Sequence, residues 1–293
     1  MTDATHGPAV TSKEIVEALR KLGLGTGRGV MVHSSLKSFG RVEGGARAVI
    51  DALMEVVTPA GTLLMPSFNH GAPFVEGDAG VFDVKTTPTT NGIIPDTFWR
   101  MPGVHRSLNP THPFAAWGKN AERYIEQHHR MLTMGPCSPL GLLLADDGLC
   151  LLLGIGYGSN TFHHVVEMST GAPCLGQRTE AYPMLLPDGR RVEGRTWSWR
   201  DGLCPFNDGG GRYGDAMRLR GLQKETVIGH CRAVLFRLRD CFDLIAEVLA
   251  EGKDGFPPCS GCLIRPRRVP QTVPSDWDKE GQCLLPSSPA RAY

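Results

Sequence analysis

The sequence lacks a long hydrophobic run and an excess of charge of either sign. Nowhere in its 293 residues is there an apolar stretch of the ~18 residues that a membrane span needs. The first residues show neither the basic region nor the apolar segment of a secretory signal. The 31 Lys and Arg are balanced by 30 Asp and Glu, unlike the composition of a general nucleic-acid binder. We therefore expect a soluble, cytoplasmic protein that binds neither nucleic acid nor a membrane.

Cysteine is present, but without the pattern of a disulfide framework or of a complete zinc site. The nine cysteines are an odd number scattered through apparent core segments, which predicts reduced thiols. Cys259 and Cys262 form a single Cys-x-x-Cys, which is half of a zinc site. Only the distant Cys204, Cys283 or His230 could complete it. A structural zinc ion stays an open alternative, and a loop without a metal is favoured.

A dinucleotide-binding fingerprint is also missing. Gly154, Gly156 and Gly158 follow an apolar segment, but their spacing differs from Gly-x-Gly-x-x-Gly. The sequence therefore gives no sign of a nicotinamide or flavin cofactor.

The apolar pattern predicts one α/β domain over residues 1–293, with a Pro- and Arg-rich tail at 257–293. Thr11 and Glu14 form a capping box at the start of a helix. Apolar segments at 30–32 and 62–65 flank an amphipathic helix, and this strand–helix–strand order predicts a partly parallel sheet. Residues 67–92 are expected to form a long loop. We predict helices also at 46–57, 93–101, 120–129, 160–168 and 234–249, and strands also at 114–117, 149–153, 182–186 and 191–199.

The strongest candidate site follows the predicted strand at 149–153. His164 and Glu167 are three positions apart, so on a helix they share a face. A carboxylate beside a histidine can fix its tautomer and make it a general base for an attacking amine. His163 lies four positions from Glu167, so the spacing alone does not choose between the two histidines. The alternative is a helix start whose polar residues have only structural roles.

Two further segments carry residues that could bind phosphate. His33, Ser34, Ser35, Lys37 and Ser38 follow a strand directly, and their hydroxyl and N–H groups could hold a phosphate or pyrophosphate. An ordinary turn with a serine cap is equally consistent with this segment.

The second of these segments is centred on Arg106 and Ser107. The planar guanidinium of Arg106 suits a phosphate group, although such a pair is more often part of the protein surface.

Taken together, several short segments resemble the aminoglycoside 3-N-acetyltransferase family. No single segment is specific, but their order between about residues 30 and 170 is. The segments that carry the resemblance are Val32-His33-Ser34-Ser35-Leu36, Phe82-Asp83, Thr87-Pro88-Thr89, Pro102-Gly103, Arg106-Ser107, Thr111-His112, residues 115–118, Gly135-Pro136, Ser138-Pro139, Leu153-Gly154, and Asn160-Thr161 with His164 and Glu167.

The resemblance implies a three-layer α/β/α fold with a mixed, partly parallel central sheet, and acetyl-CoA as the acetyl donor. It selects His164 over His163 as the base and places residues 33–38 and 106–107 near the CoA phosphates. Asp83 and His112 would lie on the acceptor side, and Thr161 is the nearest candidate to stabilise an oxyanion. The implied activity is acetylation of the 3-amino group of 2-deoxystreptamine aminoglycosides, an antibiotic-resistance activity, by a monomer or homodimer.

Two departures from the family pattern bear on the acceptor. Asn109-Pro110 stands where a His-Pro pair is expected, and the tail with Cys259 and Cys262 is not a familiar feature. Three alternatives therefore stay open. They are an acyltransferase for a non-antibiotic amine, a metal-dependent hydrolase that uses His112, His163, His164 and Glu167, and a CoA-binding protein without catalysis. A covalent route through Cys137 or Cys174 is the alternative mechanism.

Overall fold

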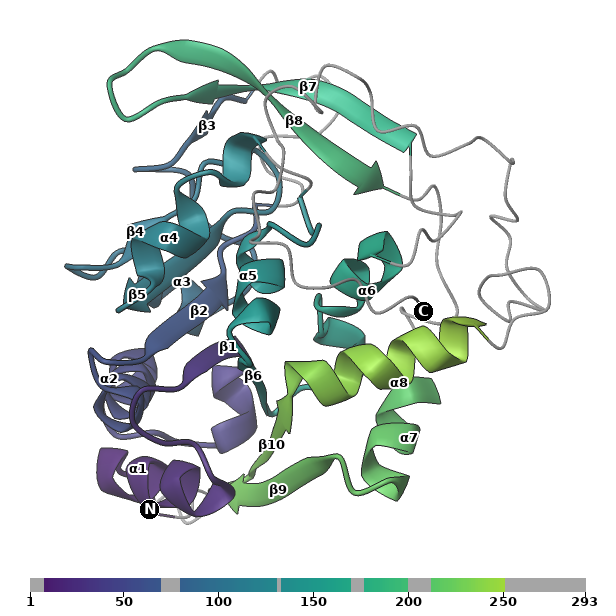
Figure 1. Cartoon of the computed structure of the whole chain (residues 1–293). Coiled ribbons are helices and arrows are strands. Elements are labelled where there is room, and N and C mark those ends of the chain that lie inside the picture. Colours follow the sequence, from purple (N-terminus) through teal and green to yellow (C-terminus); the bar gives the residue numbers. More distant parts are fainter. Residues whose placement is uncertain (1–7, 70–79, 131–132, 170–176, 200–211, 251–293) are drawn as a thin grey trace.

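The computed structural model describes residues 8–69, 80–130, 133–169, 177–199 and 212–250. Its centre is a seven-stranded sheet in the order β4-β5-β2-β1-β6-β10-β9 (Figure 1). The three inner strands β2, β1 and β6 are parallel, and the flanking strands pair antiparallel. The strands of this sheet are β1 (Gly29–Ser34), β2 (Thr62–Pro66), β4 (His105–Arg106), β5 (Phe114–Gly118), β6 (Leu149–Leu153), β9 (Gln223–Ile228) and β10 (Cys231–Arg237).

A smaller three-stranded sheet lies at one end of the molecule, beyond the central sheet (Figure 1). It is formed by β3 (Phe82–Asp83), β7 (Gln177–Leu185) and β8 (Arg191–Trp199). β7 and β8 form an antiparallel hairpin, and β3 pairs parallel to β7.

Helices cover both faces of the central sheet, because alternate residues of its buried strands point to opposite sides. Leu149, Leu151 and Leu153 of β6 pack into one core, whereas Cys150 and Leu152 pack into the other. The first core is closed by α1 (Ser12–Leu22), α2 (Gly45–Val57) and α3 (Ile93–Trp99). The second is closed by α4 (Ala121–Ile125), α5 (Pro139–Ala145), α6 (His163–Ser169), α7 (Arg212–Leu219) and α8 (Leu238–Ala250). The predicted three-layer α/β/α architecture is confirmed.

Most elements of the amino-terminal half lie where the apolar pattern predicts them. Thr11 and Glu14 make both hydrogen bonds of the capping box of α1, and the predicted strands at 30–32, 62–65, 114–117 and 149–153 are present. Short 3-10 helices follow β1, precede α5 and follow β6: η1 (Leu36–Phe39), η2 (His128–Arg130) and η3 (Tyr157–Ser159). Within the predicted loop at 67–92, residues 70–79 lie outside the described residues.

The prediction of a helix at 234–249 is wrong for its first turn. Val234, Leu235 and Phe236 belong to β10, which pairs with β6 and β9, and the helix begins only at Leu238. A short apolar run that is buried on both faces fits a strand as well as a helix. The prediction also missed β9, α5 and α7, while the Cys-x-x-Cys tail lies outside the described residues.

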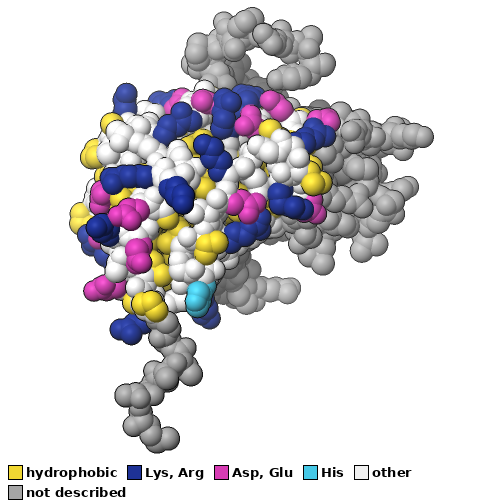
Figure 2. Space-filling view, turned by 90° about the horizontal axis from the view of Figure 1, so that it is seen from below, with side chains coloured by type: hydrophobic (Ala, Val, Ile, Leu, Met, Phe, Trp, Pro, Cys, Tyr) yellow, Lys and Arg dark blue, Asp and Glu magenta, His cyan; other side chains and the backbone are white. Residues whose placement is uncertain are grey.

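Among the described helices, none combines the length and the apolar character that crossing a bilayer requires. On the face seen in Figure 2, Lys and Arg side chains are interspersed with Asp and Glu. This mixture agrees with the nearly balanced composition, and no field of one sign dominates this face.

Candidate active site

The candidate site lies where the parallel strands β1 and β6 end. In open α/β sheets, ligands bind at the carboxyl ends of the parallel strands. The backbone N–H of Ser35 donates to the carbonyl of Leu153, which ties the end of β1 to the end of β6. Gly154 follows with a φ of 67°, and a Cβ at this position would lie 1.6 Å from Oγ of Ser38. Only glycine therefore lets η1, the predicted phosphate segment, pack against the turn that leads to α6.

Asn160 fixes the start of α6 from a fully buried position. Its Oδ1 accepts the N–H of Phe162 at 3.2 Å, and its Nδ2 donates to the hydroxyl of Tyr213 at 3.5 Å. An Asn side chain that bonds the backbone two residues later stabilises a turn locally. The same amide therefore links this turn to α7, and the residues that follow it have a defined orientation.

His164 and Glu167 are paired, as their spacing predicted. Nδ1 of His164 lies 2.8 Å from Oε2 of Glu167, whose side chain is fully buried, while the His164 side chain is 28% exposed. A buried carboxylate needs such a partner because an isolated charge is costly to bury. With Nδ1–H donated to the carboxylate, Nε2 is the nitrogen that carries the lone pair. This arrangement suits a general base.

Thr161 lies beside a second buried histidine. Its Oγ1 is 3.4 Å from Nε2 of His33, the residue of β1 that precedes Ser34. Burial lowers the pKa of His33 to about 4, so its imidazole is neutral at pH 7. His33 is therefore a neutral hydrogen-bonding partner at this site, and not a cation for a phosphate group.

His163 and His164 are neighbours in space as well as in sequence. Their ring centroids lie 4.1 Å apart, and His163 is almost fully buried. One ligand atom from each of His163, His164 and Glu167 falls within 4.8 Å of the others, a set that could hold a metal ion. His112 is not part of this set. The geometry is compatible with a general base at His164. It also brings together three of the four residues that a metal-dependent hydrolase was expected to use.

Arg106 is enclosed by protein groups. Its guanidinium donates to the carbonyls of Thr87 at 2.5 Å and Ser67 at 3.0 Å, and it stacks 4.2 Å from the ring of Trp99. Burial lowers its pKa to about 9, which leaves it charged at neutral pH. Because both terminal nitrogens are used and the residue is buried, Arg106 connects the segments around β3 and β4. Its surroundings argue against the expected contact with a CoA phosphate.

Ser107 is likewise enclosed by protein. Its Oγ lies 2.9 Å from Nδ1 of His128 and accepts the N–H of Phe114 at 2.8 Å. His128 in turn lies 2.9 Å, through Nε2, from the carbonyl of Thr133, and burial lowers its pKa to about 4. The neutral tautomer with Nε2–H satisfies both contacts and makes Ser107 the donor to Nδ1. Ser107 and His128 are both buried, and these contacts favour a structural role for the pair.

The chain is similar to known proteins over most of its length. The model of a family described as aminoglycoside 3-N-acetyltransferase matches residues 31–250. Aminoglycoside N(3)-acetyltransferase IV from Salmonella sp is 34% identical to this chain, and the match covers 90% of this chain and 96% of the relative. This chain belongs to the aminoglycoside 3-N-acetyltransferase family. It is thereby assigned to a family of acyltransferase enzymes.

Solved structures of the family agree with the fold. A histidine-to-alanine mutant of aminoglycoside acetyltransferase AAC(3)-IVa, in complex with a gentamicin, superposes with a TM-score of 0.73 at 32% identity, over 89% of this chain and 96% of that one. AAC-IIIb in its binary complex with CoASH gives a TM-score of 0.74 at 24% identity, over 85% and 98% of the two chains. At that identity the second likeness concerns the fold alone.

Asp83 and His112, the acceptor-side residues expected from the acetyltransferase family, make contacts within the segments between β2 and β5. The Asp83 carboxylate accepts from the backbone N–H of Lys85 and the hydroxyl of Thr86, and so it closes its own turn. His112 packs edge-on against Phe68 at 4.9 Å. These contacts hold both side chains in place, and their role toward an acceptor stays a prediction.

Asn109, the departure from the family pattern, organises the turn that carries His112. Its Oδ1 accepts the N–H groups of Thr111 and His112 at 3.1 and 2.8 Å. This role, like that of Asn160, was not predicted. The sequence did contain a signal for this role. An Asn side chain often accepts hydrogen bonds from the backbone N–H groups two or three residues later in a turn.

The cysteines differ from the prediction at one position. Cys150, Cys231 and Cys241 are buried free thiols, as expected. Cys137, in contrast, is disulfide-bonded, and it is therefore not a thiol that could carry an acetyl group. Cys174, the other candidate for a covalent route, lies outside the described residues.

Proposed function

We propose that this chain transfers the acetyl group of acetyl-CoA directly to the 3-amino group of a 2-deoxystreptamine aminoglycoside, with His164 as the general base. The observation that carries the proposal is the 2.8 Å contact between Nδ1 of His164 and the buried carboxylate of Glu167. Because Nδ1 is used in this contact, Nε2 of the partly exposed His164 is the nitrogen that can accept a proton from the amine. The family assignment and the gentamicin complex of a relative's histidine mutant support the choice of substrate and of a histidine.

The reaction needs one proton acceptor and one oxyanion partner. The neutral amine attacks the thioester carbon and forms the C–N bond, while its proton passes to Nε2 of His164. The C–S bond then breaks, and the leaving thiolate takes the proton from His164, so that CoASH and the amide are released. General-base help of this kind is worth about 10²–10⁴ in rate. Glu167 holds the ring in the required tautomer throughout.

The oxyanion that forms on the carbonyl needs a hydrogen-bond donor. Thr161 is our candidate, since its hydroxyl lies at the start of α6 and contacts the neutral His33. In the free enzyme the hydroxyl of Thr161 can donate its hydrogen bond to Nε2 of His33. Because a hydroxyl hydrogen can rotate, the same group can donate to the oxyanion when it forms.

The donor and acceptor sites are assigned to the two flanking segments. Ser34, Ser35, Lys37 and Ser38 are proposed to bind the pyrophosphate of acetyl-CoA, with the exposed Lys37 as the cation. The acceptor side is proposed to include His112 and the half-buried Asp83. A carboxylate has about four acceptor positions, so the two bonds within its own turn leave Asp83 able to bind an ammonium group.

The first test is release of CoA from acetyl-CoA, followed with a thiol reagent, against a panel of aminoglycosides. We expect turnover that disappears when the 3-amine is blocked. Binding of acetyl-CoA without turnover on any aminoglycoside would contradict the acceptor and direct the search to other amines. Absence of turnover over a wide panel of amines would support a binding protein instead.

The second test is His164→Ala. We expect kcat to fall by about 10²–10⁴ with the affinity for CoA retained. His105→Ala is the matched control, because His105 is partly exposed on β4 and pairs weakly with Glu122 at 3.9 Å. An unchanged kcat in His164→Ala would exclude His164 as the base. Ping-pong kinetics would favour a covalent route.

A further inference from the structure

A pocket lies at the end of the central strands that is opposite the candidate active site. It is formed where β6 begins and β10 ends, since Leu149 pairs with Arg237 and Phe236 pairs with Gln223. The active-site helix α6 follows the other end of β6. The five residues of β6 separate the two ends by roughly 15 Å, at about 3.3 Å per residue. The pocket is therefore distinct from the site of acetyl transfer.

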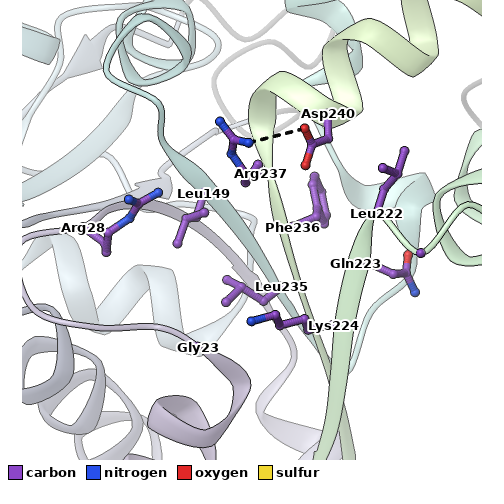
Figure 3. Close-up of a pocket in the computed structure, with 11 residues that line it drawn as sticks. Gly23, Arg28, Leu149, Leu222, Gln223, Lys224, Leu235, Phe236, Arg237 and Asp240 are labelled. Carbon is purple, nitrogen blue, oxygen red and sulfur yellow. Dashed lines mark ion pairs between the residues drawn. The ribbon is translucent and has the colours of Figure 1, made fainter.

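The pocket combines an apolar floor with a basic rim (Figure 3). Its volume is about 380 Å³, which is within the range of small-molecule sites. Leu149 and Leu235 form the floor on the same face of the sheet as Lys224 and are almost fully buried, whereas the Phe236 side chain packs into the core on the other face. Arg28 and Lys224 supply cations from separate segments of the chain, and Arg237 supplies a third.

Ion pairs neutralise two of the three cations. Arg237 bonds Asp147 at 2.8 Å and lies 3.8 Å from Asp240, while Arg28 lies 3.7 Å from the same Asp147. No ion pair of Lys224 occurs within the described part of the chain. Three cations against two carboxylates leave a net charge of +1, located at Lys224.

The glycine at the end of α1 leaves room for this ammonium. A Cβ on Gly23 would lie 3.1 Å from Nζ of Lys224, and the φ of 106° at Gly23 would strain any other residue there. Figure 3 shows the Lys224 side chain extending from β9 toward Leu235, so its charged end lies beside the apolar floor. A ligand can thus contact both at once.

We propose that this pocket binds a small aromatic or branched aliphatic monocarboxylate. The apolar body would cover Leu149 and Leu235, and the carboxylate would pair with Lys224. A monoanion matches the single unneutralised charge. A phosphate dianion would need a second cation, and both arginines are already paired with Asp147. An organic cation would be repelled.

The experiment uses the full chain saturated with acetyl-CoA, so that the catalytic site is occupied. Calorimetric titrations compare 2-naphthoate with acetate, which lacks the apolar body, and with 2-naphthylmethylammonium, which reverses the charge. We expect only 2-naphthoate to bind measurably. We also expect Lys224→Met to weaken its binding about tenfold, and Lys224→Glu to transfer the preference to the ammonium probe. Lys119→Met is the matched control, because Lys119 is exposed and does not line the pocket.

Several outcomes would overturn the proposal. These are equal binding of the two charged naphthyl probes, unchanged affinity in Lys224→Met, and a crystal structure in which 2-naphthoate occupies only the catalytic site. None of these measurements depends on acetyltransferase activity. A failure of the proposed function is therefore distinguishable from a failure of this proposal.

Discussion

Oγ1 of Thr161 lies 3.4 Å from Nε2 of His33, although 128 positions separate the two residues in the chain. The contact joins the end of β1, where the donor is proposed to bind, to the start of the helix that carries the base. It forms because β1 and β6 are parallel neighbours and their carboxyl ends meet at one edge of the sheet.

We predict that Thr161→Val lowers kcat by about 10²–10³, the loss typical of one oxyanion donor. Thr161→Ser keeps the hydroxyl and should retain most of the activity. The measurement is steady-state kinetics with the best aminoglycoside substrate. Equal kcat in the Val and Ser variants would show that the hydroxyl has no part in the reaction.

Glu167→Gln tests the role of the buried carboxylate. The amide can still hydrogen-bond to His164, but it no longer offers a charge to stabilise the imidazolium that forms during transfer. We expect kcat to fall by about 10–10², with the KM for acetyl-CoA little changed. Glu55→Gln, on the exposed surface of α2, is the matched control and should match the wild type. A Glu167→Gln enzyme of full activity would reduce Glu167 to a packing residue.

Ser107→Ala distinguishes a structural role from a role in CoA binding. The substitution removes the donor to His128 and the acceptor for the N–H of Phe114, both of which are buried. Leaving buried polar groups unsatisfied costs about 1–3 kcal/mol each, so we expect a clear loss in the free energy of unfolding. Urea denaturation measures it. The KM for acetyl-CoA should stay the same, and a large rise in that KM at unchanged stability would restore Ser107 to the CoA site.

The sequence could predict what depends on local spacing. His164 and Glu167 meet because three residues on a helix bring two side chains to one face, and this required no knowledge of the fold. Arg106 is the opposite case. Its interpretation depended on Trp99, Thr87 and Ser67 enclosing its guanidinium, and these contacts arise only when distant segments pack together. The same limit applies to the residues around Val234. Their apolar pattern fits a helix as well as a strand, and only the pairing with β6 makes them a strand.

Two buried histidines predict how stability depends on pH. Burial lowers the pKa values of His33 and His128 to about 4 in the folded protein, against an ordinary 6.5. The unfolded chain therefore binds more protons between pH 6.5 and 4, and stability is full above pH 6.5 and falls as the pH drops through this window. At pH 5 the loss is about 2 kcal/mol per histidine, an order-of-magnitude value.

The measurement is the free energy of unfolding in urea at pH 7 and at pH 5. His128→Gln should lower stability at pH 7, because it disturbs the contacts with Ser107 and Thr133. It should also lose less stability than the wild type on going to pH 5, since one titrating group is gone. An equal pH dependence in the two proteins would show that folding does not lower the pKa of His128.

Removal of metal separates the transferase from the hydrolase. The ligand atoms of His163, His164 and Glu167 are close enough to hold an ion. However, the 2.8 Å between Nδ1 of His164 and Oε2 of Glu167 is a hydrogen-bond distance. Tetrahedral zinc with bonds of about 2.0–2.2 Å would hold its two ligand atoms roughly 3.3 Å apart. The pair as it stands therefore favours a shared proton over a shared ion.

We accordingly expect dialysis against a chelator to leave kcat unchanged, and metal analysis of the purified enzyme to find zinc well below one equivalent per chain. The Cys259–Cys262 segment could bind zinc independently, so the analysis is repeated on a Cys259→Ser, Cys262→Ser variant. One equivalent of zinc that survives in this variant, with activity lost on chelation and restored by zinc, would contradict the general-base mechanism. It would instead assign His163, His164 and Glu167 as metal ligands.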